Sequence, residues 1–190
     1  MSSKPGPIPA ESCDFCRAAV AQRHQHVIDA AAWKVECVCD ACAVLFGSQG
    51  QTKYLRVPRR IRFLQNFRLT DEQWDGLLIP IAMAFLFHSS RHGKVVALYP
   101  SPAGAVESQL TLESWQEIAG SNPELANMQK DVEGLLVYRI GTAREHFLVP
   151  IDECFSLIGI IRMHWKGLSG GSGMWNEVRK CLAALKERSH

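Results

Sequence analysis

The chain of 190 residues lacks several features that would place it in a familiar class. It has no apolar run of about eighteen residues, so we expect no segment to insert into a membrane. Its first residues include no apolar stretch of the signal-peptide kind, and we therefore expect a cytoplasmic protein. The net charge of +2 at pH 7 gives no indication for or against nucleic acid as a partner.

Motifs of enzyme active sites are also missing. No phosphate-binding or dinucleotide-binding glycine pattern occurs. Residues 167–171 match the G-x-S-x-G nucleophile motif in letters, but a helical pattern precedes them and the only later histidine is His190. That motif needs a preceding strand and an acid and a histidine after it. The remaining histidines are scattered, so we predict a protein without catalytic activity.

Cysteine is the residue type that stands out among those present, with seven in the chain. Four of them form two close pairs, CDFC and CDAC, separated by twenty-two residues. A tetrahedral metal ion needs four ligands, and two such pairs can supply them. In a reducing compartment, metal binding is favoured over disulfides. The predicted ligands are Cys13, Cys16, Cys39 and Cys42.

The residues around these pairs suggest how the metal module folds. Residues 26–29 and 33–36 alternate as two strands of a hairpin, although the three alanines between them are poor turn formers. A helical turn closed by Gly47 follows the second pair. A cysteine pair, a hairpin and a second pair at a helix start are typical of a treble-clef or zinc-ribbon-like module.

The sequence favours structural zinc over iron. Iron-binding knuckles usually carry glycine after the second cysteine, and here Arg17 and Ala43 occupy those positions. Cys37 is a possible replacement ligand, because residues two apart on a strand face the same way, or else a small buried hydrophobe. His24 and His26 are alternative ligands, or polar residues of a solvated hairpin edge.

We expect three regions along the chain: a disordered leader (1–12), a four-cysteine metal-binding module (13–50) and an α+β domain (51–190). In the last region, helix signals alternate with paired strand signals, which predicts an antiparallel sheet backed by helices. The expected strands are 81–88, 94–99, 105–110, 134–140 and 145–150. The expected helices begin at Thr70, Thr111, Asn122, Asp152 and Met174.

Two features of the larger region suggest a binding surface. Between Ala41 and Thr70 the chain has cations but no acid, and apolar residues are interleaved with them. Such a segment is an ordinary amphipathic stretch, a protein-binding surface or a nucleic-acid-binding one. The predicted helix 152–165 is apolar on most sides, so it is buried or docks a partner. The candidate partner-binding residues are Arg56, Arg59, Arg60, Arg62, Trp74 and Trp165.

The two cysteine pairs, together with LTDEQWDGLLIPIAMAFLF, KVVALYPSPAGAVES and HFLVPIDECFSLIGIIRMHWKG, resemble an uncharacterised bacterial family. Its genes are often found beside actinobacterial-type NiFe-hydrogenase operons. The cysteine module is similar to a rubredoxin-type or zinc-ribbon accessory. Residues 73–76, followed by Pro80 and Met83, resemble hydrogenase assembly chaperones that bind the precursor small subunit.

The resemblance implies a non-catalytic accessory protein in hydrogenase maturation, with an immature hydrogenase subunit as its partner. Two other functions stay open on the sequence. One is a small zinc-bearing nucleic-acid-binding protein that uses residues 53–68, although we expect a protein partner rather than nucleic acid. The other is a rubredoxin-like one-electron carrier with iron in place of zinc.

Overall fold

The structure is a computed structural model that describes residues 11–47, 53–108, 112–167 and 170–189. The chain divides into two compact units, residues 1–57 and 58–190. The expected boundary after residue 50 therefore lies too early. The metal module extends further because strand β3 (Tyr54–Arg56) pairs with its hairpin. Most of the expected leader lies outside the described residues.

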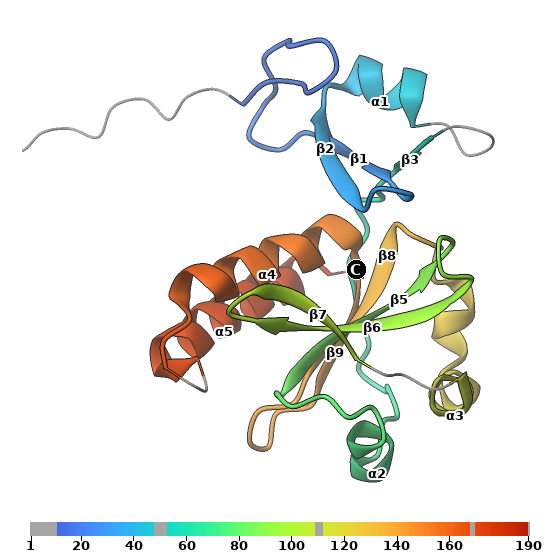
Figure 1. Ribbon diagram of the computed structural model, residues 1–190, viewed down its shortest axis with the longest axis vertical. Helices are drawn as coiled ribbons and strands as arrows, with labels where there is room; N and C mark the ends of the chain where they lie inside the picture. Colours follow the sequence, from blue (N-terminus) through green and yellow to red (C-terminus); the bar gives the residue numbers. More distant parts are fainter. Residues whose placement is uncertain (1–10, 48–52, 109–111, 168–169, 190) are drawn as a thin grey trace, which may run out of the picture. The chain divides into compact units, whose positions relative to one another are not determined.

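The first unit contains a three-stranded antiparallel sheet in the order β2-β1-β3 (Figure 1). Strands β1 (Gln25–Asp29) and β2 (Lys34–Val38) form the predicted hairpin. The Asp29 carboxylate closes the alanine turn by accepting hydrogen bonds from the backbone N–H groups of Ala31 and Ala32, each at 3.1 Å. Trp33 adopts a left-handed φ of 56° within this turn. The second strand therefore begins one residue later than expected.

Helix α1 (Asp40–Phe46) follows β2 directly. Cys39 is its N-cap, with the sulfur accepting a hydrogen bond from the backbone N–H of Cys42 at 3.5 Å. The helix ends at Gly47, whose N–H donates to the Ala43 carbonyl at 3.0 Å. A Cβ at Gly47 would lie only 2.5 Å from that carbonyl oxygen, so the close approach requires glycine.

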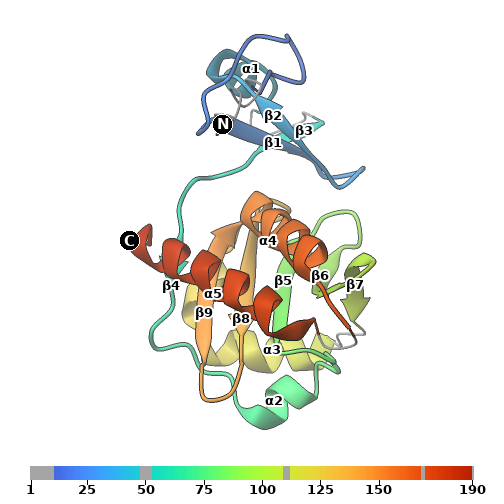
Figure 2. The ribbon, with the colours of Figure 1, turned by 90° about the vertical axis from the view of Figure 1, so that its left-hand side faces the viewer.

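The second unit is built on an antiparallel sheet, as the sequence predicted (Figures 1 and 2). The sheet has six strands, because the short strand β4 joins the five that were expected. Its strand order is β4-β9-β8-β5-β6-β7. Both faces of the central strands are buried, which explains their continuous apolar sequences. The strands are β4 (Arg62–Phe63), β5 (Met83–Ser89), β6 (Lys94–Ser101), β7 (Gly104–Ser108), β8 (Glu133–Tyr138) and β9 (Glu145–Pro150).

Helices cover both faces of this sheet. On one face lie α2 (Asp71–Asp75), α3 (Leu112–Ser121) and the 3-10 helix η1 (Pro123–Asn127). Trp115, Ile118 and Leu125 of α3 and η1 pack there against alternate strand residues such as Leu86, Leu135 and Leu148. On the other face lie α4 (Ile151–His164) and α5 (Gly171–Glu187), side by side in Figure 2.

The packing of helix α4 explains why its sequence is apolar on most sides. It packs against both the sheet and α5, and Cys154, Leu157, Ile158 and Ile161 are buried as a result. Met163 near its C-terminus is 75% exposed. Within the described residues, none of the helices combines the length and the apolar character needed to cross a lipid bilayer.

Candidate metal centre

The first cysteine pair lies in a tight loop that is hydrogen-bonded to the hairpin. The Arg17 N–H donates to the Cys13 carbonyl at 2.9 Å, and Arg17 has a left-handed φ of 64°. Asp14 fixes the loop to β2 in two ways. Its N–H donates to the Cys37 carbonyl at 2.8 Å, and its carboxylate accepts from the Cys37 N–H at 2.7 Å. The loop thus presents Cys13 and Cys16 toward the end of β2.

The second pair lies at the start of α1. Cys39 caps the helix and Cys42 belongs to its first turn, so the two sulfurs lie on the same side of the helix N-terminus. The order of cysteine loop, hairpin and helix start is the treble-clef-like arrangement that the spacing predicted.

The four predicted ligands come together. The sulfurs of Cys13, Cys16, Cys39 and Cys42 all lie within 4.8 Å of one another, with Cys16 and Cys39 at 3.7 Å. All seven cysteines of the chain are free thiols. Cys13 and Cys42 are buried, whereas Cys16 is exposed at the surface of the module. Four thiols at this separation match the donor set of a closed tetrahedral site for zinc or iron.

The electrostatics of the group also fit a cation. Burial of Cys13 opposes ionisation, but hydrogen bonds from the backbone of Cys16, Cys39 and Phe15 outweigh it and lower the pKa of Cys13 to about 6. Burial, together with the neighbouring thiols and the Cys13 charge, raises the pKa of Cys42 to about 12. Cys13 therefore ionises easily, whereas Cys42 beside it resists a second negative charge, and a bound divalent cation would remove that repulsion.

Cys37, His24 and His26 do not join these four sulfurs. They form a separate group whose ligand atoms lie within 4.8 Å of one another. Strand β2 ends at Val38, so Cys39 no longer follows the strand alternation that would have aligned it with Cys37. His24 is also not a residue of a solvated edge, because its side chain is only 7% exposed.

The four arginines proposed for partner binding have different environments. Arg60 forms a two-pronged ion pair with Glu133, with N···O distances of 2.5 and 2.9 Å, and the Glu133 side chain is 1% exposed. Arg56 donates to the side chain of Gln25 at 3.1 Å, and Arg62 donates to a backbone carbonyl at 3.4 Å. Arg59 is exposed. Most of this cationic segment is thus engaged within the chain.

Both proposed tryptophan anchors are half-buried. Trp74 packs against the core of the larger unit, with the Arg139 guanidinium 5.6 Å from its ring centre. Trp165 follows α4, and its indole N–H donates to the Gly167 carbonyl at 2.8 Å. The exposed apolar side chains nearby in sequence are instead Leu78, which is 70% exposed, and Met163.

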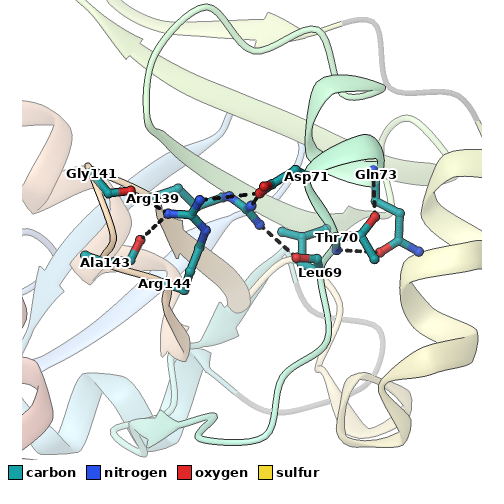
Figure 3. A network of polar contacts seen from close by, with 8 residues as sticks. All are labelled: Leu69, Thr70, Asp71, Gln73, Arg139, Gly141, Ala143 and Arg144. Carbon is teal, nitrogen blue, oxygen red and sulfur yellow. Dashed lines mark hydrogen bonds and ion pairs between the residues drawn. The ribbon is translucent and has the colours of Figure 1, made fainter.

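A polar network that the sequence did not reveal connects α2 to the β8–β9 turn (Figure 3). Arg139, whose side chain is 4% exposed, donates to the Leu69 carbonyl at 2.9 Å and to the Asp71 carboxylate. Arg144 reaches the same carboxylate at 3.4 Å. Burial, reinforced by the charges of Arg139 and Arg144, lowers the pKa of the nearby His146 to about 4. His146 is therefore neutral at pH 7.

Fold and site together define an α+β protein with an N-terminal four-cysteine module. A family model described as a family of unknown function, DUF5947, matches residues 12–189, and the chain belongs to this family. Neither a curated protein nor a solved structure matches the chain.

Proposed function

We propose that this protein is a non-catalytic accessory factor whose first unit is held together by a structural zinc ion and whose second unit binds a protein partner. The observation that supports a metal site is the convergence of four thiols from a loop and a helix start, and the choice of zinc rests on Arg17 and Ala43 in place of the glycines of an iron knuckle. Four protein ligands leave no open position, which is the arrangement of structural rather than catalytic zinc sites.

We further propose that the partner is an immature NiFe-hydrogenase subunit in the cytoplasm. This part rests on the family resemblance of the sequence. The larger unit offers surface features that suit a protein partner, since Leu78 and Met163 are exposed apolar side chains and Arg59 is an exposed cation. Apolar anchors supply most of the affinity in such interfaces, and charged residues mainly steer association. Because Lys53, Arg56, Arg60 and Arg62 all make contacts within the chain, we do not propose nucleic acid.

A one-electron carrier is the second candidate, and two observations favour it. Cys16 is exposed, which would bring a redox ion close to the surface. Arg17 holds the left-handed backbone conformation that glycine would adopt in an iron knuckle. The identity of the metal separates the two functions.

Metal analysis of protein purified without added metal tests the first half of the proposal. We expect zinc at the four-cysteine group, measured as the loss of at least about one zinc per chain in the Cys39→Ser variant. Iron with a red colour that this variant abolishes would instead support the electron carrier. Equal metal contents in the variant and the unchanged protein would contradict both.

Capture of hydrogenase components from cells that express the hydrogenase tests the second half. The Leu78→Asn and Met163→Gln variants should each weaken capture, by up to about 30-fold for a side chain worth ~2 kcal/mol. The matched control is Leu45→Gln, an equally exposed leucine on α1 of the other unit. A deletion strain that assembles fully active hydrogenase at normal levels would show the proposal to be wrong.

A further inference from the structure

The two faces of the β1–β2 hairpin carry different chemistry. Val27 and Val38 lie on one face and pack with Cys13 and Cys42. Side chains alternate along a strand, so His26 and Cys37, the next residues in the register, lie on the opposite face. Ligands on that face cannot complete the four-cysteine group. Any metal chemistry there is a separate site.

His26 and Cys37 are direct cross-strand partners. The backbone N–H and carbonyl of Cys37 both bond to Asp14, on the side of β2 away from β1. The carbonyl of His26 likewise accepts from Val57, on the side of β1 away from β2. The pair is therefore of the non-hydrogen-bonded type, in which the Cα atoms approach to about 4.5 Å and the side chains lie closest.

His24 completes the group from the segment before β1. Its ring centre lies 4.6 Å from that of His26, with the rings nearly perpendicular. Its Nδ1 lies 2.9 Å from the Ala21 carbonyl, which can only accept, so Nδ1 carries a proton. In a neutral imidazole with this tautomer, Nε2 is the atom that offers a lone pair to a metal ion. The Glu11 carboxylate lies 3.4 Å from the same Nδ1. An outer carbonyl or carboxylate on one ring nitrogen is the usual support of a histidine that binds metal through the other.

The Nε2 atom of His24 requires a partner. Its side chain is 93% buried, because only 7% of it is exposed, and this nitrogen has no hydrogen-bond partner among the described residues. A buried acceptor left without a partner is destabilising. A metal ion held between the imidazoles and the Cys37 thiolate would supply the missing partner.

We infer that His24, His26 and Cys37 form a second metal site, which binds a borderline divalent transition-metal ion of the zinc type. Their ligand atoms lie within 4.8 Å of one another. Two imidazoles and a thiolate suit zinc and its neighbours, whereas magnesium and calcium prefer oxygen ligands. Three protein ligands leave a fourth position for water or an external ligand. This site thus differs in kind from the closed four-cysteine group.

The test uses the full chain, dialysed to equilibrium against micromolar Zn²⁺ at neutral pH, with metal counted by mass spectrometry. We expect about two zinc ions per chain, and about one in the Cys37→Ser and His24→Gln variants. Cys181→Ser, a cysteine of α5 outside both groups, is the matched control and should keep about two. If the Cys37→Ser and His24→Gln variants bind as many zinc ions per chain as the unchanged protein, the proposal is wrong.

Two further measurements do not depend on counting alone. With Co²⁺ in place of Zn²⁺, the second equivalent should add thiolate-to-metal charge-transfer absorbance in the unchanged chain and in Cys181→Ser, but not in Cys37→Ser. In the unchanged chain, saturating zinc should slow alkylation of Cys37 by iodoacetamide beyond the effect of the first equivalent. Alkylation of Cys37 at the same rate with one and with saturating equivalents would refute a bound thiolate without any variant.

Discussion

Replacing Cys39 by serine should unfold the first unit while the second stays folded. Cys39 has two roles, since its sulfur caps α1 and is also one of the four predicted metal ligands. Serine is a good N-cap, so the substitution preserves the cap and removes the thiolate. The Cys39→Ser variant therefore isolates the contribution of the metal.

The size of the effect follows from how little else holds this unit together. Its hydrophobic cluster has five buried residues, and two of them, Cys13 and Cys42, are themselves ligands. Loss of an outer-shell partner already weakens metal binding about 10- to 100-fold, and loss of a direct ligand costs more. A hundredfold weaker affinity removes about 2.7 kcal/mol of stability, a large fraction of what a small unit possesses.

Hydrogen exchange followed by mass spectrometry can measure the two units separately. In the variant, amides of β1, β2 and α1 should exchange quickly, whereas those of β5, β8 and α4 should stay as protected as before. A chelator added to the unchanged chain should produce the same pattern. Retained protection of β1 and β2 in the variant would refute the role of metal, and loss of protection in β5 and β8 would refute the independence of the units.

Three further predictions concern the second unit. Because the folded pKa of His146 is lowered to about 4 from an ordinary 6.5, the unfolded chain binds the proton first, and stability should fall by about 3 kcal/mol as the pH drops from 6.5 to 4. Denaturant titrations at several pH values check this, and His146→Gln should flatten the curve; a steep curve in that variant would assign the effect elsewhere. Arg60→Ala should cost about 2–3 kcal/mol in urea unfolding because it leaves the buried Glu133 carboxylate unpaired, whereas Arg59→Ala should stay within about 0.5 kcal/mol. Equal effects of the two arginine changes would contradict this role of the pair. Thr70→Ala should cost about 1 kcal/mol by removing the capping box of α2, and thermal melts showing no change would mean that packing alone sets this helix start.

Sequence reasoning succeeded where the signal is local. The two cysteine pairs specify their own convergence, since each pair is a short turn and both lie beside one hairpin. Thr70 begins a helix as expected, and it forms a capping box with Gln73 whose two hydrogen bonds involve only residues three apart. The five expected strands of the second unit correspond to β5 to β9 within two residues at each end, because apolar periodicity, glycine and proline mark them. The short strands β3 and β4 were not expected, and the last helix begins at Gly171 rather than at Met174.

The features that escaped prediction depend on contacts between distant residues or on the exact register. Arg60 and Glu133 are 73 residues apart in sequence, and no local pattern indicates that the two side chains form an ion pair. The expected hairpin turn of residues 30–32 would place His26 opposite Glu36. The observed turn is one residue longer and places it opposite Cys37. A shift of one residue changes every cross-strand partner. Without the observed register, the pairing of His26 with Cys37 is not visible, and the sequence offers His24, His26 and Cys37 only as alternative ligands for the ion of the four-cysteine group.

The division of the chain at Val57 has a consequence for synthesis. All residues of the four-cysteine group, the hairpin and its third strand precede that point, and among the described strands no later one joins their sheet. At about 5–20 residues per second, the roughly 130 residues of the second unit take some 6 to 26 seconds more to translate. During this interval β4, the strand nearest the boundary, has no partner strand until β9 has been translated. The nascent first unit can therefore fold on the ribosome, with the ion proposed for its four cysteines, before the second unit exists.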